Sequence, residues 1–174
     1  MFSTLPDLID PWRAADSGTV LAGRLPLGSM PRLCGLLLDT TGDVVFRLDF
    51  RRDEGGRAVV TGEMSARLSL RCQRCLEEME HQVTETVDLA LVTGIDEAQR
   101  LPDRYEPLLV EENLIRPRDI IEDELLLNLP QIPKHDPGGC GLEVDSGSHP
   151  EAGVRSNDEN PFAALAAIRR NNKR

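Results

Sequence analysis

Four residues of this chain have the types and the spacing of a metal site. Cys72 and Cys75 are separated by two residues, at a place where one predicted strand turns into the next. Two thiolates on one side of a tight turn suit a tetrahedral zinc ion, but they supply only half of its ligands. His135 and Cys140, in a stretch rich in proline and glycine, complete a Cys3His set. The sequence therefore predicts one structural zinc ion, held by two distant segments.

Two other interpretations of the cysteine pair stay open. A Cys-x-x-Cys pair can be a redox couple, although this one lacks the strand-to-helix setting of thioredoxin-like proteins. The pair can also be two reduced cysteines in a turn, beside an exposed His135. Cys34 lies in an early apolar segment, where a cysteine packs as a small apolar side chain. His81 and His149 have no neighbour at ligand spacing and are left out of the site.

Candidate partner-binding residues lie beside the cysteines and at the C-terminus. Arg71 and Arg74 each precede a cysteine and can contact phosphate, or they can lie in solvent beside the glutamates that follow. Near the C-terminus, three apolar residues at helical spacing precede a basic end, which suits a docking segment. The candidate set is Arg71, Arg74, Phe162, Leu165, Ile168, Arg169, Arg170, Lys173 and Arg174.

Other catalytic patterns are missing from the sequence. There is no glycine-rich phosphate loop, and no Ser, His and Asp arrangement can be read from spacing. Glu122, Asp123 and Glu124 can form an acid/base or magnesium cluster, but adjacent helical residues point in different directions. We therefore expect these carboxylates to be a solvated helix face, and we predict that the protein is not an enzyme.

The elements that position these residues are predicted from apolar periodicity. Between Asp43 and Val92 apolar and polar residues alternate, which indicates antiparallel strands with one buried face. Asp53 to Gly56 is typical of a hairpin turn, because glycine adopts positive φ without strain. The residues expected on the buried face are Val44, Phe46, Leu48, Phe50, Met64, Ala66, Leu68, Leu70, Val83, Val87, Leu89 and Leu91.

Helices are expected to cover that face. Residues 119–129 have helical spacing, with Pro117 at the start and Pro130 after the end. A short helix is predicted to start at Ser29 and Pro31 and to run through Leu38, after an early strand over residues 19–27. The predicted fold class is α+β, an antiparallel β-meander packed against one or two helices, with a disordered linker and a short C-terminal helix.

The chain is predicted to contain three parts. Residues 1–136 form the α+β core domain, and residues 137–159 are a flexible acidic linker, because glycine, serine and acidic residues dominate there. Residues 160–174 form a short basic docking helix, with Asn160 as its N-cap and Pro161 as its first residue. Docking on a partner and packing back on the core domain stay open as alternatives for this helix.

Charge and composition restrict the partners. With 20 basic and 30 acidic residues the net charge is −10, which opposes general nucleic-acid binding and suits a basic protein partner. No apolar run is long enough to span a membrane. The start of the chain lacks the layout of a secretory signal, so a cytoplasmic location with reduced thiols is expected.

An ordered set of motifs resembles the YceD family across most of the chain. The set comprises Cys72-Gln73-Arg74-Cys75, Tyr105-Glu106-Pro107, the run from Glu122 to Pro130, Pro133-Lys134-His135, Cys140 and Asn160-Pro161-Phe162-Ala163. The resemblance implies a ribosome biogenesis factor needed for synthesis, processing or stability of 23S ribosomal RNA, with no established enzymatic activity. It also favours zinc, because relatives carry cysteine and histidine at the same positions.

The resulting prediction is a factor that acts by binding rather than by catalysis. Its expected partner is the large-subunit rRNA precursor or a basic ribosomal or processing protein, with no membrane and no small-molecule substrate. An RNA-processing enzyme and a zinc/thiol redox switch are the alternatives. The acidic charge and the missing catalytic set oppose the first of these, and mild oxidation tests the second.

Overall fold

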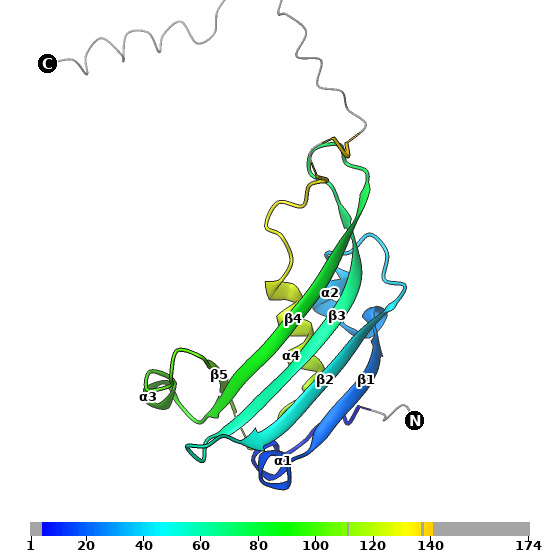
Figure 1. Cartoon of the computed structure of the whole chain (residues 1–174). Coiled ribbons are helices and arrows are strands. Elements are labelled where there is room, and N and C mark those ends of the chain that lie inside the picture. Colours follow the sequence, from blue (N-terminus) through cyan, green and yellow to red (C-terminus); the bar gives the residue numbers. More distant parts are fainter. Residues whose placement is uncertain (1–4, 111, 137, 141–174) are drawn as a thin grey trace, which may run out of the picture. The chain divides into compact units, whose positions relative to one another are not determined.

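The chain folds around a five-stranded sheet, which the computed structural model describes together with its helices over residues 5–110, 112–136 and 138–140 (Figure 1). The strands, in their order across the sheet, are β1 (Val20–Pro26), β2 (Asp43–Arg52), β3 (Ala58–Arg71), β4 (Glu78–Val92) and β5 (Glu106–Leu109). Strands β1 to β4 pair antiparallel, and β5 runs parallel to β4. The predicted α+β class and its antiparallel meander are confirmed.

The predicted alternation sets which face of the sheet is buried. Every residue expected on the inner face of the three predicted strands is buried. Gly62, in the middle of β3, lets β2 approach closely, because a Cβ there would collide with the carbonyl oxygen of Arg47. Asp53 closes the β2–β3 turn, where its buried carboxylate accepts hydrogen bonds from the amides of Gly55 and Arg57, both at 2.8 Å.

Helix α4 (Pro117–Leu127) covers the inner face, as predicted, and lies behind β3 and β4 in Figure 1. Pro117 stands in its first turn, where a missing N–H is tolerated. Ile121 and Leu125 are fully buried against the sheet, and Leu129, beyond the helix end, packs at the edge of the same core. Burying each such side chain contributes roughly 1.5–3 kcal/mol, so this stripe attaches the helix firmly.

The helix predicted from Ser29 through Leu38 is wrong in extent. The segment forms a 3-10 turn, η1 (Leu27–Ser29), and one helical turn, α2 (Pro31–Cys34). Ser29 does not cap α2, because its hydroxyl donates instead to the Pro26 carbonyl at 2.6 Å. Met30 occupies the cap position and has no capping side chain of its own.

Three short elements were not predicted from periodicity: α1 (Pro11–Ser17), α3 (Ile95–Ala98) and β5. Helix α1 has recognisable ends. The Asp10 carboxylate accepts from the amides of Trp12 at 3.0 Å and Arg13 at 3.1 Å, and Gly18 adopts a left-handed φ of 64° after its last turn. The capping residues that mark this helix were therefore present in the sequence, but the helix is too short to show a clear apolar period.

The described residues belong to a compact unit that spans Met1–Gly141. The predicted docking helix, 160–174, and most of the predicted linker lie outside the described residues. Residues 138–140, at the start of that linker, are described and end at a buried Cys140. Among the described helices, none combines the length and the apolar character that a membrane span requires.

Candidate metal centre

The first two candidate ligands lie in the tip of the β3–β4 hairpin. The Cys72 amide donates to the Glu77 carbonyl, and the Leu76 amide donates to the Cys72 carbonyl, both at 2.9 Å. The Arg74 amide donates to the Cys72 sulfur at 3.4 Å. These bonds fold the tip so that both cysteine side chains lie on one side of it. Leu76 adopts a φ of 67°, a conformation that costs an L-residue roughly 1–2 kcal/mol, so the surrounding tip must hold it there.

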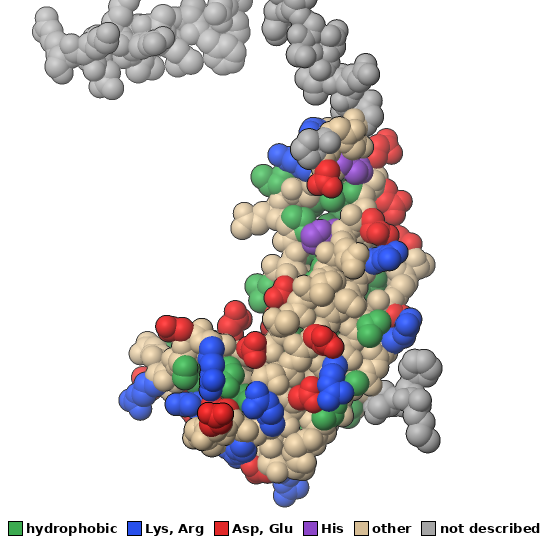
Figure 2. Space-filling view, viewed as in Figure 1, with side chains coloured by type: hydrophobic (Ala, Val, Ile, Leu, Met, Phe, Trp, Pro, Cys, Tyr) green, Lys and Arg blue, Asp and Glu red, His purple; other side chains and the backbone are tan. Residues whose placement is uncertain are grey.

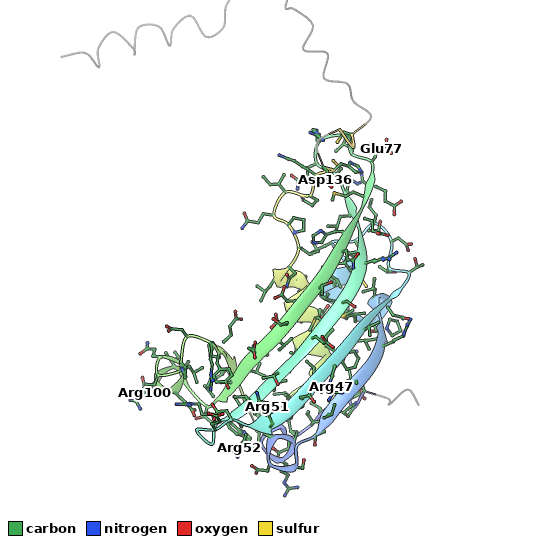
Figure 3. The ribbon with its side chains drawn as sticks, viewed as in Figure 1. Arg47, Arg51, Arg52, Glu77, Arg100 and Asp136 are labelled. Atoms are coloured by element: carbon green, nitrogen blue, oxygen red, sulfur yellow. The ribbon has the colours of Figure 1, made fainter. Side chains whose placement is uncertain are left out.

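The other two candidate ligands arrive after α4. The Gln73 amide donates to the Pro133 carbonyl at 2.8 Å, which fixes this segment against the hairpin tip. A turn follows, with the Gly139 amide donating to the Asp136 carbonyl at 2.9 Å, and it brings Cys140 back to the tip. In Figure 3, Glu77 of the hairpin and Asp136 of the later segment lie at the same end of the sheet.

The four ligand atoms lie close enough together to surround one ion. They lie within 4.8 Å of one another, with the Cys72 and Cys140 sulfurs 3.6 Å apart and His135 Nδ1 at 3.4 Å and 3.5 Å from the sulfurs of Cys75 and Cys140. A tetrahedral zinc ion with bonds of about 2.3 Å to sulfur and 2.0 Å to nitrogen gives S···S edges of about 3.8 Å and S···N edges of about 3.5 Å. The residues therefore fit zinc in type and in geometry.

His135 is oriented for this role by a backbone carbonyl. Its Nε2 lies 3.0 Å from the oxygen of Glu78, which can only accept a hydrogen bond. Nε2 therefore carries a proton, so the neutral ring presents on Nδ1 the lone pair that a metal ligand needs. Without a metal, hydrogen bonds to the sulfurs of Cys140 and Cys72 raise the pKa of His135. A bond of this kind from the second ring nitrogen is the usual support of a metal-ligating histidine.

Without a metal, the cluster favours the thiolates of Cys72 and Cys140. Burial alone would raise the pKa of Cys72, but hydrogen bonds from the amides of Cys75, His135 and Arg74 outweigh it and lower the pKa to about 5. Burial likewise opposes ionisation of Cys140, whose pKa is lowered by the Arg74 guanidinium and by His135. Thiolate is the form that binds metal, so the protein environment prepares Cys72 and Cys140 as ligands. At Cys75 a hydrogen bond from the Glu77 amide is outweighed by burial and by the neighbouring cysteines, which raise its pKa.

Comparison with known proteins identifies the family. A family model described as "Large ribosomal RNA subunit accumulation protein YceD" matches residues 60–169. A curated protein of the same name from Haemophilus influenzae is 30% identical over 171 residues, which cover 95% of this chain and 96% of that protein. The chain belongs to the YceD family. A comparison with solved structures finds no match for it.

The two arginines of this YceD-family hairpin have different surroundings. Arg74 donates through Nε to the Cys140 sulfur at 2.9 Å and through its terminal nitrogen to the His135 carbonyl at 3.4 Å. Its guanidinium thus places one positive charge beside the thiolates. Arg71 is exposed and stands opposite Glu78 in the β3–β4 register. The remaining partner-binding candidates, from Phe162 onward, lie outside the described residues and stay predictions.

The two other cysteine and histidine candidates with described positions are outside the cluster. Cys34 is half-buried at the end of α2, where its thiol donates to the Leu27 carbonyl at 3.4 Å. It therefore packs as a small side chain, but it is less buried than predicted. The ring Nε2 of His81 lies 3.2 Å from the Asn128 carbonyl, beyond the end of α4.

The prediction that Glu122, Asp123 and Glu124 form a solvated helix face is wrong for Glu122. Its side chain is 2% exposed and accepts from the amides of Arg32 at 2.7 Å and Leu33 at 3.1 Å. The Arg32 guanidinium completes the set at 3.0 Å and also pairs with Asp123. Glu122 therefore supplies the cap that α2 lacks, from a helix remote in the sequence. Nothing in the spacing of three adjacent acidic residues indicates which one is buried.

Proposed function

We propose that this protein supports accumulation of the large ribosomal RNA subunit and that it acts by binding rather than by catalysis. The observation that carries the proposal is its alignment with the Haemophilus influenzae protein of that name over nearly the whole of both chains. Its site of action is then the cytoplasm, where bacterial ribosomes assemble. From the family membership we infer a role in synthesis, processing or stability of 23S ribosomal RNA.

The four candidate zinc ligands support a role in binding rather than in catalysis. Four protein ligands fill a tetrahedral zinc ion and leave no position for a substrate or an attacking water, which is the arrangement of structural zinc sites. Cys72, Cys75, His135 and Cys140 would hold the ion, and zinc would supply a cross-link between the hairpin tip and the segment after α4. The buried Glu122 is occupied by two amides and Arg32, so it is not free to act as an acid or base.

Charge supports a basic partner or a local RNA contact. The net charge of −10 repels RNA from the chain as a whole, but salt screens that repulsion beyond roughly 8 Å under cellular conditions. We therefore propose that the partner contacts Arg71, which is exposed on the hairpin, and the basic residues of the segment 160–174. Arg74 is partly engaged by Cys140. The partner is the large-subunit rRNA precursor or a basic ribosomal or processing protein.

Deleting the gene is expected to lower mature large-subunit rRNA more than small-subunit rRNA. The role of the named relative concerns the large subunit, so the ratio of the two mature rRNAs should fall and should recover with the gene restored. Quantitative separation of total RNA from growing cells measures that ratio. An unchanged ratio, or equal loss of both rRNAs, would contradict the proposal. If the purified protein with metal shortens precursor rRNA by itself, the enzyme alternative replaces binding.

Removing residues 160–174 is expected to leave the core domain folded and to weaken association with pre-ribosomal particles. The segment carries an apolar face and four terminal cations, which can contribute several kcal/mol before the cost of ordering. Co-sedimentation with particles measures association. Neutralising only Arg169, Arg170, Lys173 and Arg174 is the matched variant, and its effect should shrink at high salt. Full co-sedimentation of the truncated chain would exclude this segment as the docking element.

A further inference from the structure

The β4 strand has an open edge along most of its length. Strand β5 pairs only with its last residues, from Leu89 to Val92. In Figure 1 no other strand lies beside the middle of β4 on that side, and α4 lies behind the sheet. The segment after α4 passes β4 only near the hairpin tip, where it lines a cavity together with Glu80 and His81. The stretch from Glu80 to Thr86 therefore has a strand partner on one side only, β3.

Three hydrogen bonds show which backbone groups of β4 face the open side. Toward β3, the Glu77 carbonyl accepts from the Cys72 amide at 2.9 Å. Away from β3, the Val92 carbonyl accepts from the Val110 amide at 2.9 Å, and the Glu78 carbonyl lies 3.0 Å from His135. The β3–β4 register is continuous between these points, so the backbone groups of alternate residues face outward. In the open stretch these are Glu80, Gln82, Thr84 and Thr86.

These outward backbone groups are available to a partner. In the described part of the chain, no backbone or side-chain group outside the sheet donates to or accepts from them. All four residues are exposed. Unpaired amide and carbonyl groups in a straight row are a template for an additional strand, and charged side chains are a common guard against unwanted pairing.

The surroundings of this edge are acidic. Glu85 lies on the inner face of β4, Glu106 at the start of β5 and Glu124 on α4. Glu106 pairs with Leu89, four residues after Glu85, and α4 packs against β4, so the three carboxyl groups lie on neighbouring elements. In keeping with this, burial raises the pKa of Glu124, and the negative charges of Glu106 and Glu85 raise it further. Among the described residues none of the three forms an ion pair. Figure 2 shows acidic side chains along this side of the molecule, between β5 and the hairpin tip.

We propose that the β4 edge from Glu80 to Thr86 binds an extended segment of a partner protein that carries lysine or arginine at alternate positions. The segment adds a strand to the sheet through the outward amide and carbonyl groups. Its alternate basic side chains lie on the inner-face side, opposite Glu85, Glu106 and Glu124. This inference deepens the proposed function, on which its biological meaning rests, by giving the chemistry of one partner.

The negative charge of this edge favours a basic protein segment over two other possible partners, RNA and a second copy of the chain. RNA would bring phosphates against unpaired carboxylates, which oppose its approach. A second copy of the chain, paired edge to edge through β4, would place like charges opposite each other, which destabilises a sheet. A basic segment instead supplies the missing cations. At about 3.3 Å per residue, a partner stretch of about seven residues matches the open edge.

The test uses the full-length protein and a labelled peptide of about nine residues that alternates lysine and threonine. Fluorescence anisotropy at about 0.15 M salt measures its binding. The same peptide N-methylated at alternate amides keeps the charge but loses the donors of one edge. We expect the unmethylated peptide to bind and the methylated peptide to bind at least about tenfold more weakly. Equal binding of both peptides would overturn the added strand and leave a purely ionic contact.

Two protein variants locate the site. Thr84→Pro removes an outward amide and should abolish binding, whereas Ala22→Pro, on the opposite edge strand β1, is the matched control. If Thr84→Pro does not fold, the variant with Glu85, Glu106 and Glu124 all changed to Gln decides, and we expect about tenfold weaker binding. Unchanged binding in that variant overturns the proposal. The proposal is also overturned if oligouridylate or a second copy of the chain binds to the protein and Thr84→Pro removes that binding.

The outcome is independent of the rRNA experiment. Peptide binding is measured with purified protein, whereas the proposed function is measured in cells. A protein that restores the rRNA ratio but does not bind the peptide contradicts only this inference. A protein that binds the peptide while its deletion leaves the rRNA ratio unchanged contradicts only the proposed function.

Discussion

Replacing Cys72 by serine is expected to remove the bound zinc and to loosen the end of the sheet. Cys72 is fully buried in the hairpin tip, and serine cannot supply the thiolate that completes the Cys3His set. Zinc content should fall from about one ion per chain to nearly none. Because the metal binds only the assembled site, its loss should lower the free energy of unfolding by about 2–5 kcal/mol.

The structure also predicts where the loosening occurs. The apolar core between the sheet and α4 does not include the metal ligands, so most of the domain should stay folded. Among the described residues, the hairpin tip and the segment from Pro133 to Cys140 are joined by one backbone hydrogen bond, from Gln73 to Pro133, by side-chain bonds of Arg74 and His135, and by the cluster itself. Amide hydrogen exchange should therefore increase in these two segments and change little in β2.

Cys34→Ser is the matched control, because Cys34 is half-buried and lies outside the cluster. It should keep the zinc and lose less than about 1 kcal/mol of stability. Protein purified without a metal-affinity step is the sample for elemental analysis. Metal-free wild-type protein with unchanged thermal stability would refute the zinc centre. A disulfide that forms under mild oxidant and releases the metal would support the redox alternative instead.

Local patterns in the sequence were sufficient to predict the central strands. Val44 to Phe50 alternates with polar residues, and a period of two has one structural explanation when a single face is buried. The same reasoning placed Cys72 and Cys75 in the β3–β4 turn. Short elements were missed for the opposite reason. Strand β5 has four residues, and its pairing with β4 depends on the fold rather than on its own pattern.

The metal cluster required a different kind of information. Spacing suggested each half of the Cys3His set, but no local rule brings His135 to Cys72. That approach depends on α4, which returns the chain along the sheet, and on the bond from the Gln73 amide to the Pro133 carbonyl. The family resemblance compensated for the missing long-range information. It did not identify Glu122, whose burial depends on the position of α2.

Replacing Glu122 by alanine is expected to destabilise the fold by about 2–4 kcal/mol. The substitution leaves the amides of Arg32 and Leu33 without their acceptor, and Leu33 is fully buried. It also leaves the Arg32 guanidinium without its buried partner and opens a cavity between α2 and α4. Urea denaturation of the variant and the wild type measures the difference.

The same carboxylate gives stability a defined pH dependence. Burial would raise the pKa of Glu122, but hydrogen bonds from the Leu33 amide and from the Arg32 side chain and amide hold it below its usual value. A carboxyl group with a lowered folded pKa stabilises the fold above its unfolded pKa, about 4.3, and that contribution is lost as pH falls through the folded pKa. Glu122→Gln should therefore be less stable at neutral pH and should lose less stability on acidification.

The neighbouring carboxylates are the matched controls for Glu122. Asp123 is about half exposed and pairs with Arg32 at the surface, so Asp123→Ala should cost less than about 1 kcal/mol. Burial and the neighbouring carboxylates raise the pKa of Glu124, so Glu124→Ala should be neutral or slightly stabilising at neutral pH. Equal effects of all three substitutions would contradict the α2–α4 link. A folded Asp123→Ala protein that fails to restore large-subunit rRNA would instead favour a catalytic role for this carboxylate, because stability alone could not explain the loss.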